Sequence, residues 1–377
     1  MFSKIEKKYL QRCFDLAQLG NGSTSPNPCV GSVIVYDNEI IGEGWHQYYG
    51  DAHAEVNAVT SILPSKKHLL QESTIYVSLE PCHHFGKTPP CVDLILKENI
   101  KHVVVAFKDP NPKVAGQSIK KLHLNGITAK TLYDNNNTKT TSFVVNKQAP
   151  LAFFTNILQQ RPYIILKWAE TADGFLGKID EQTPISNELS KRLVHKWRSE
   201  CDAIMIGRKT AETDNPKLNN RYYFGKSPVR IVLDRTNRLD SSLTLFDNSL
   251  KTIIYCEKQQ PNINNTEGGT FVVKKGKNIE INNLIFDDNL LNNIMTDLLS
   301  KKIGILLVEG GAALLNSFIE HNLWDEARVI KSAHTLRQNN KPSLAHEEGI
   351  KAPKLEETFI EDRIMLDDNT VTFYKNF

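Results

Sequence analysis

In the N-terminal part of the chain, the apolar residues switch repeatedly between helical and strand spacing. The segment from Ser3 to Gly20 has a helical period, and Ser3 with Glu6 can form a capping box at its start. Residues 29–45 are predicted to form two strands around a turn at Asp37 and Asn38. Helices are expected from about residues 53 and 91, and strands at 74–80 and 102–107. This alternation favours an α/β layer sandwich.

A polar stretch rich in Asn and Thr, residues 131–150, interrupts the pattern. It is the best candidate for a domain boundary. We expect a first domain over 1–145, a linker over 146–160 and a second domain over 161–377. No internal repeat is found.

The second half shows another α/β pattern. Strands are predicted at 163–169, 203–207, 229–234, 252–256 and 303–311. Ser186 is expected to cap a helix that runs to about Glu200, and further helices are expected at 288–300 and 312–320. Residues 258–288 are rich in Asn and weakly patterned.

Composition narrows the function classes. The 377 residues include 46 basic and 43 acidic side chains spread along the chain, so the net charge of +3 gives no basic patch to argue for nucleic acid. No apolar run is long enough to span a membrane, and the charged first twenty residues lack the apolar core of a signal peptide. A cytoplasmic protein is expected, in which the six cysteines bind metal or are simply buried.

Three side chains of the kind that bind zinc occur in order, namely His53, Cys82 and Cys91. Zinc takes nitrogen and sulfur ligands in a tetrahedron, and a catalytic site leaves the fourth position to water. His53 and Cys91 each open a predicted helix, where the helix dipole favours thiolate and a bound anion. Glu55 follows His53 by two residues and can carry a proton without being a ligand. This arrangement is the one that zinc nucleobase deaminases use.

One spacing departs from the usual deaminase pattern, in which two residues separate the two cysteines. Here eight residues, HHFGKTPP, separate Cys82 from Cys91. His83 or His84 could supply a fourth ligand, so a purely structural zinc site is an alternative at this stage.

The motifs around these residues resemble a known family, the bifunctional riboflavin biosynthesis proteins of bacteria. The first half is similar to their deaminase domain in PNPCVGSVIV, HAEVNAV, EPCHHFGKTPPC and DPNPKVAGQSI. The second half is similar to their reductase domain in KWAETADG, ISNELSKRLVHKWRSECDAIMIG, TAETDNPKLNNR, PVRIVLD and LLVEGGAALLNSF. The resemblance implies an N-terminal cytidine-deaminase-like three-layer α/β/α domain and a C-terminal dihydrofolate-reductase-like α/β domain.

The resemblance also implies two successive reactions on one small phosphorylated pyrimidine. Zinc and Glu55 would remove the 2-amino group of 2,5-diamino-6-(5-phosphoribosylamino)pyrimidin-4-one by hydrolysis, and NADPH would then reduce the ribosyl group to ribityl. The family's deaminase-substrate contacts fall on Asn27 and His46, with Lys87, Asp109 and Asn111 as weaker candidates. The family commonly self-associates, so a homodimer or homotetramer is expected, without nucleic-acid or membrane partners.

The reductase half has its own sequence signal, a buried apolar strand followed by Gly310, Gly311 and a helix. Small residues there let a phosphate approach backbone N–H groups, but the G-x-G-x-x-G fingerprint of a Rossmann domain is absent. The resemblance places reductase-substrate contacts on Thr183, Arg198, Leu218, Arg221 and Glu309. It places NADPH contacts on Ala169, Thr210, Asp214, Gly311, Ala312, Ala313, Leu314, Leu315, Asn316 and Ser317, with Lys167 and Asp173 lining the same cleft.

One position departs from the family. Pro184 stands where many relatives carry a Trp that contacts the cofactor, which puts the geometry of this loop in question. Two other classes of function are open. A deaminase that edits nucleic acids would need a basic groove with interleaved aromatic residues, and a zinc-stabilised scaffold would tolerate Glu55→Gln without loss of activity.

Overall fold

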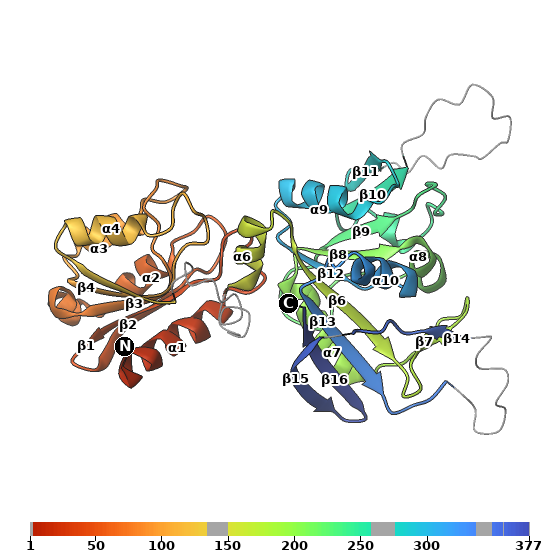
Figure 1. The fold of residues 1–377 in the computed structure, drawn as a ribbon, viewed down its shortest axis with the longest axis horizontal. Helices are drawn as coiled ribbons and strands as arrows, with labels where there is room; N and C mark the ends of the chain where they lie inside the picture. Colours follow the sequence, from red (N-terminus) through yellow and green to blue (C-terminus); the bar gives the residue numbers. More distant parts are fainter. Residues whose placement is uncertain (1–2, 134–149, 258–275, 337–348, 357, 377) are drawn as a thin grey trace. The chain divides into compact units, whose positions relative to one another are not determined.

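The computed structural model describes residues 3–133, 150–257, 276–336, 349–356 and 358–376. The chain forms two compact units, Met1–Gln160 and Arg161–Phe377 (Figure 1). The first unit contains α1 (Lys4–Gln18), β1 (Gly31–Tyr36), β2 (Glu39–Trp45), α2 (Ala54–Thr60), a 3₁₀ helix η1 (Pro64–Glu72), β3 (Thr74–Leu79), α3 (Cys91–Lys97), β4 (His102–Phe107), α4 (Gln117–Leu124), β5 (Thr128–Tyr133) and α6 (Leu151–Leu158).

The first unit is a five-stranded sheet with helices on both faces. Its strand order is β2-β1-β3-β4-β5, antiparallel at β2-β1-β3 and parallel from β3 to β5. Because side chains alternate along a strand, Val33 and Val35 of β1 pack under α1, whereas Ile34 packs under α2 and α3. This is the three-layer α/β/α domain that the sequence predicts.

Several local predictions in this unit are confirmed. Ser3 and Glu6 form the capping box of α1. Asp37 and Asn38 turn between β1 and β2 with φ of 45° and 63°, in the left-handed region that Asn and Asp tolerate. In the segment expected to be a linker, 146–160, the described part includes α6, whose Phe154 packs against Phe107 in the core of the first unit. Residues 134–149 lie outside the described part of the chain.

The second unit contains β6 (Tyr163–Glu170), β7 (Phe175–Lys178), α7 (Glu188–Glu200), β8 (Ala203–Gly207), α8 (Arg208–Asp214), β9 (Val229–Leu233), a 3₁₀ helix η2 (Thr244–Phe246), β10 (Thr252–Glu257), β11 (Ile279–Leu284), α9 (Leu290–Ser300), β12 (Ile305–Val308), α10 (Ala312–Glu320), β13 (Glu326–Ser332), β14 (Gly349–Lys351), β15 (Phe359–Leu366) and β16 (Asn369–Lys375). Nine of these strands form one sheet in the order β11-β10-β9-β8-β12-β6-β13-β16-β15. The strands from β11 to β13 run parallel, and β16 and β15 are added antiparallel.

Two predictions for the second unit need correction. The helix α7 is capped by Asn187 and not by Ser186: the Asn187 side chain accepts a hydrogen bond from Ser190 N at 2.9 Å, as an N-cap one residue closer to the helix can. The expected strand 303–311 is shorter, because β12 ends at Val308 and the chain turns at Glu309 and the two glycines. Within the weakly patterned segment 258–288, residues 279–284 form β11, and 258–275 lie outside the described residues.

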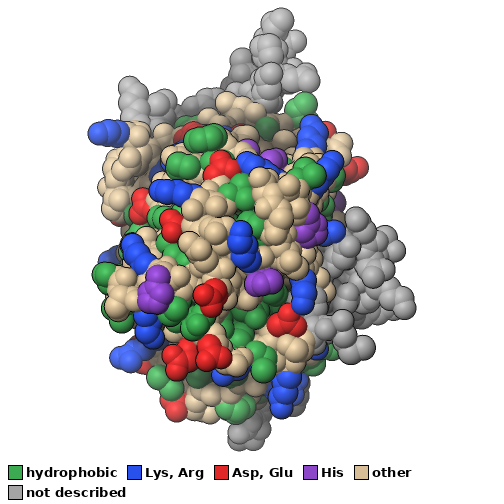
Figure 2. Space-filling model, turned by 90° about the vertical axis from the view of Figure 1, so that its left-hand side faces the viewer, with side chains coloured by type: hydrophobic (Ala, Val, Ile, Leu, Met, Phe, Trp, Pro, Cys, Tyr) green, Lys and Arg blue, Asp and Glu red, His purple; other side chains and the backbone are tan. Residues whose placement is uncertain are grey.

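The surface agrees with the balanced charge of the sequence. On the face drawn in Figure 2, Lys and Arg side chains are interspersed with Asp and Glu, without a broad area of one sign. Within the described residues, no helix is both long and apolar enough to cross a membrane.

Candidate active sites

A metal site forms where two helix starts meet the end of a strand in the first unit. His53 is the N-cap residue of α2, Cys91 is the first residue of α3, and Cys82 follows β3. The His53 Nδ1 atom lies 3.5 Å from Cys82 Sγ and 3.3 Å from Cys91 Sγ. All three ligand atoms lie within 4.8 Å of one another. One imidazole nitrogen and two sulfurs converging in this way fit zinc, which prefers these donors.

The other two histidines of the motif do not join this cluster. Among the described residues, the one group of His, Cys, Asp and Glu atoms close enough to hold a metal is His53, Cys82 and Cys91. His84 lines the adjacent cavity instead, and the ring of His83 packs edge-on against the ring of His84. Three protein ligands leave a coordination position for water, which favours a catalytic over a structural zinc.

The hydrogen bond between the two cysteine side chains raises the pKa of Cys91 and lowers that of Cys82. The backbone N–H of Cys91 donates to Cys82 Sγ at 3.3 Å. A hydrogen bond from the Cys91 side chain, assisted by His53 and this N–H, lowers the pKa of Cys82 to about 4. The Cys82 thiolate is therefore favoured at neutral pH, and a thiolate is the form that binds metal.

Glu55 lies on the first turn of α2, next to these ligands and 3% exposed. Burial, and secondarily the negative charge of Cys82, raise the pKa of this carboxyl above its ordinary value. A raised pKa means that this carboxyl group binds a proton more readily than a carboxyl group in water, as a group that takes a proton from water must.

The cluster opens into a cavity of about 490 Å³, which is lined by Glu55, His53 and Cys82 together with four of the five predicted deaminase contacts, Asn27, His46, Lys87 and Asp109. The fifth, Asn111, is not among the lining residues; its side chain accepts a hydrogen bond from Lys113 N at 3.0 Å and stabilises the turn after β4. The cavity is large enough for a nucleotide-sized ligand.

His46 is fixed in one tautomer by its neighbours. Its Nδ1 atom donates to the carbonyl of Ala52 at 3.0 Å, because a carbonyl only accepts. The Nε2 atom therefore accepts from the Asn27 amide at 3.1 Å. Burial lowers the pKa of His46, which keeps the ring neutral. Asn27 is held in the cavity by this bond.

Sequence reasoning missed one residue of this site, Glu80. Its buried carboxylate accepts hydrogen bonds from Asp109 N at 3.1 Å, Gly116 N at 2.9 Å and Ser118 N at 3.2 Å, which ties the end of β3 to the loop that carries Asp109. The signal was present: a carboxylate ends an apolar strand directly before the Pro-Cys of the zinc motif. Such a group needs several donors to be stable when buried.

In the second unit, three of the predicted residues form one buried charge cluster at the carboxyl ends of parallel strands. Arg198 on α7 donates to both carboxylate oxygens of Glu309, at 2.9 and 2.8 Å. Lys167 near the end of β6 lies 3.6 Å from the same carboxylate. Burial raises the pKa of Glu309, but Arg198 and then Lys167 outweigh it and lower the value to about 2. Glu309 is therefore ionised at neutral pH.

Arg221 lies close by and is differently placed. Its guanidinium donates to Asn219 Oδ1 at 2.9 Å and lies 4.8 Å from the centre of the Tyr222 ring, on an exposed loop. Arg198 also donates to the Asn219 carbonyl at 3.2 Å. Leu218 precedes this loop, buried and with φ of 48°, which is uncommon for a bulky residue.

Several of the predicted cofactor residues lie at the start of α10. The Gly311 N–H donates to Thr210 Oγ1 on α8 at 3.0 Å, so these two residues are in direct contact. Ala312, Ala313 and Leu314 form the first turn of α10, whose backbone N–H groups suit an anion. Asn316 and Ser317 follow on α10, and the Ser317 hydroxyl donates to Ala313 O at 3.0 Å. Ala169 at the end of β6 packs partly against the core under α7.

Leu315 is placed differently from its neighbours in this run. Its side chain is fully buried in the core of the second unit. Its N–H already donates to Gly311 O at 3.2 Å within the helix. A run of seven residues on a helix necessarily turns some of its members toward the core.

Thr183 and Asp173 stabilise turns. The Thr183 hydroxyl accepts from Lys178 N at 3.0 Å, closing the loop after β7 in which Pro184 is exposed. The Asp173 carboxylate accepts from Thr171 Oγ1 at 2.6 Å and from Leu336 N at 3.0 Å.

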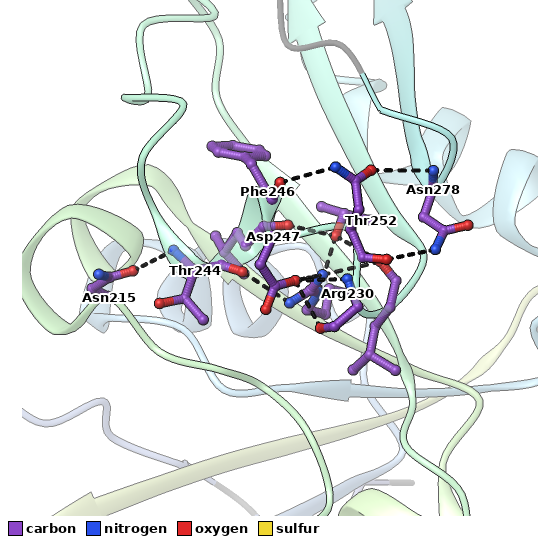
Figure 3. Close-up of polar contacts among 11 residues, drawn as sticks. Asn215, Arg230, Thr244, Phe246, Asp247, Thr252 and Asn278 are labelled. Atoms are coloured by element: carbon purple, nitrogen blue, oxygen red, sulfur yellow. Dashed lines mark hydrogen bonds and ion pairs between the residues drawn. The ribbon is translucent and has the colours of Figure 1, made fainter.

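Asp214 ends α8, which is anchored by the residue after it (Figure 3). Asn215 accepts from Thr244 N at 2.8 Å, and the loop of Thr244 is held by the buried Arg230. The Arg230 guanidinium donates to Thr244 O, Thr252 Oγ1, Asp247 Oδ1 and Leu250 O, all at 2.9 to 3.0 Å. This network fixes the end of the helix that carries Thr210.

Comparisons with known proteins match both halves of the chain. Residues 3–107 match the cytidine and deoxycytidylate deaminase zinc-binding region, and residues 162–364 match the RibD C-terminal domain. The riboflavin biosynthesis protein RibD of Aquifex aeolicus is 36% identical over 332 residues, covering 87% of each chain. RibD of Bacillus amyloliquefaciens is 32% identical over 93% of this chain and 90% of its own.

Solved structures show the same two-domain protein. The diaminohydroxyphosphoribosylaminopyrimidine deaminase/5-amino-6-(5-phosphoribosylamino)uracil reductase of Thermotoga maritima matches with a TM-score of 0.80 and 28% identity over 99% of both chains. RibD of Acinetobacter baumannii matches with a TM-score of 0.80 and 27% identity, also over 99% of both. The chain therefore belongs to the RibD family and is a bifunctional riboflavin biosynthesis enzyme, a zinc-dependent deaminase joined to an NADPH-dependent reductase.

Proposed function

We propose that the chain acts twice on one pyrimidine ribotide. It first hydrolyses the 2-amino group of 2,5-diamino-6-(5-phosphoribosylamino)pyrimidin-4-one and then reduces the ribosyl side chain to give 5-amino-6-(5-phosphoribitylamino)uracil. The observation that carries the proposal is the convergence of His53, Cys82 and Cys91 beside the buried Glu55, in a chain whose second half matches the RibD reductase domain.

In the deaminase step, His53 Nδ1 and the two cysteine thiolates would hold the zinc ion. Zinc bound there supplies a Lewis acid that makes water nucleophilic at neutral pH. Glu55 takes up the proton that water loses and delivers it to the departing amino group. Asn27, fixed by His46, donates to the pyrimidine, and Lys87 offers a cation to the anionic substrate; its Nζ atom lies 4.0 Å from the centre of the Tyr49 ring.

In the reductase step, the protein binds and orients, and NADPH supplies the hydride. The two arginines have different roles. Arg198 is buried and donates two hydrogen bonds to Glu309, so it holds that carboxylate in position to bind the sugar hydroxyls. Arg221 is exposed and is the better partner for the phosphate, which a guanidinium can grip through two hydrogen bonds. The first turn of α10 receives a phosphate of the cofactor.

Assembly and location remain predictions. We infer a homodimer or homotetramer in the cytoplasm from the family resemblance. Light scattering of the purified protein measures the number of chains in the assembly. The mixed charge on the face in Figure 2 supports a small-molecule substrate over nucleic acid.

Incubation of the purified protein with the diaminopyrimidine ribotide, with and without NADPH, tests the proposal. Without NADPH we expect one product, in which oxygen replaces the amino group, together with ammonia. With NADPH we expect a second product that has gained two hydrogen atoms. Mass spectrometry separates the two, and protein stripped of metal with a chelator is the control for the first step. Absence of both products from zinc-loaded protein would contradict the proposal.

A further inference from the structure

His195 is a buried residue of the second unit with no role in the assignments above. It lies on α7, three residues before Arg198 and therefore on the same side of the helix, and it is 3% exposed. It contacts the loop that carries Arg221 and lies close enough to Arg198 and Glu309 for their charges to act on its pKa. Its surroundings give it a specific hydrogen-bonding state.

The Nδ1 atom of His195 accepts a hydrogen bond from the backbone N–H of Arg221 at 3.1 Å. A ring nitrogen that accepts carries no proton, so the ring is neutral with its proton on Nε2. Burial, followed by the positive charges of Arg198 and Arg221, lowers the pKa of His195 to about 4, which keeps Nδ1 available as an acceptor at neutral pH.

The ring of His195 also supports the side chain of Arg221. Tyr222 packs edge-on against His195 with 4.7 Å between the ring centres, and the Arg221 guanidinium lies 4.8 Å from the centre of Tyr222. Tyr222 thus links the buried His195 to the exposed Arg221. A guanidinium held on an aromatic ring has fewer conformations to lose when it binds an anion.

The base of the loop has hydrogen bonds that do not involve His195. Asn220 N donates to Ser227 Oγ at 3.0 Å, and the Asn220 amide donates to Gly225 O at 3.1 Å. Loss of His195 would therefore leave these two bonds in place but remove the acceptor of the Arg221 backbone N–H and the ring behind Tyr222. This separation makes the contribution of His195 measurable.

We propose that His195 is a positioning residue, which holds Arg221 for the phosphate of the reductase substrate and so lets the reductase select the phosphorylated over the dephosphorylated pyrimidine. The inference rests on the proposed function, since it assumes that Arg221 meets the phosphate. It predicts an effect on substrate KM and little effect on kcat, because the hydride is transferred at the other end of the sugar.

Two substitutions of similar polarity test the acceptor. In His195→Asn the side-chain oxygen can occupy the place of Nδ1, whereas in His195→Gln it lies one bond further out. We expect the Gln variant to raise the reductase KM for the phosphorylated substrate about tenfold, with kcat close to that of the wild type. The Asn variant should have a KM close to that of the wild type. Equal KM values for the two variants would overturn the proposal.

Two further measurements separate this proposal from the proposed function. The dephosphorylated riboside should show the same KM with wild type and His195→Gln. In an Arg221→Ala background, His195→Gln should add little, because the group it positions is gone; fully additive effects would overturn the proposal. If wild-type protein reduced neither substrate, the proposed function itself would fail.

Should His195→Gln not fold, His195→Ala with and without added imidazole makes the same comparison. A KM that imidazole leaves unchanged would count against the proposed role of His195.

Discussion

Each of the two units buries a carboxylate in its site. The pKa of one carboxylate is raised above its ordinary value, and the pKa of the other is lowered. Glu55 is 3% exposed, and burial raises its pKa. The Glu309 side chain is 9% exposed, and its pKa is about 2. Burial acts on both in the same direction. The difference lies in the partners, because Glu55 has a thiolate beside it, whereas Glu309 has Arg198 and Lys167.

The comparison teaches that burial alone does not tell what a carboxylate does. A buried carboxylate without a strong cationic partner favours its protonated form, which suits a group that takes a proton from water and passes it to the departing ammonia. A carboxylate held by two cations stays charged and acts as a fixed point for binding and folding. Removal of the negative charge should therefore affect catalysis in the first unit and stability in the second.

The largest effect is expected for Glu55→Gln. Glutamine keeps the shape of the side chain but cannot carry a proton, so the rate of ammonia release should fall by a factor of about 10² to 10⁴. NADPH oxidation on substrate that is already deaminated should be unchanged. Zinc content measured by mass spectrometry is the control, and loss of both activities in folded, zinc-loaded protein would refute the separation of the two sites.

For Glu309→Gln we expect a loss of stability. The substitution leaves Arg198 and Lys167 buried without their counter-charge, which typically costs about 3 to 5 kcal/mol. The matched control is Glu257→Gln, which breaks a two-bond ion pair with Arg235 on the surface, where solvent screens the charges and a much smaller loss is expected. Denaturant unfolding measures both. Equal losses would show that burial of the first pair does not matter.

Much of the first site could be predicted from the sequence because its determinants are local. The His-x-Glu spacing sets a ligand and a proton carrier on one helix start, and the positions of His53 and Cys91 at helix starts are confirmed. The capping box of α1 and the turn at Asp37 and Asn38 are equally local. Each depends on residues a few positions apart, so tertiary structure has little chance to override it.

The second site depends on contacts between distant residues. Arg198 and Glu309 are 111 positions apart. The sequence around each residue gives no sign that their side chains form hydrogen bonds with each other. The strands β15 and β16 were not predicted, because β15 is mostly exposed and has little apolar pattern to detect. The core position of Leu315 could be recognised only after the face of α10 toward the sheet was known.

The smallest expected effect is a change in acid stability, which sharpens the comparison in the second unit. Folding lowers the pKa of Glu309 from its ordinary value of 4.5 to about 2. The resulting stability is fully present above about pH 4.5 and is lost as pH falls toward about 2, because the unfolded chain binds the proton first. The difference corresponds to about 3 kcal/mol at most. Thermal unfolding of wild type and Glu309→Gln between these pH values measures it. Because the variant lacks this group, its midpoint should fall less steeply with acid. Glu326→Gln is a useful parallel, since Arg328 and Lys375 lower the pKa of that buried carboxyl, against the effect of burial, to about 2 as well. An equally steep fall in wild type and Glu309→Gln would mean that Glu309 is not held ionised by its two cations.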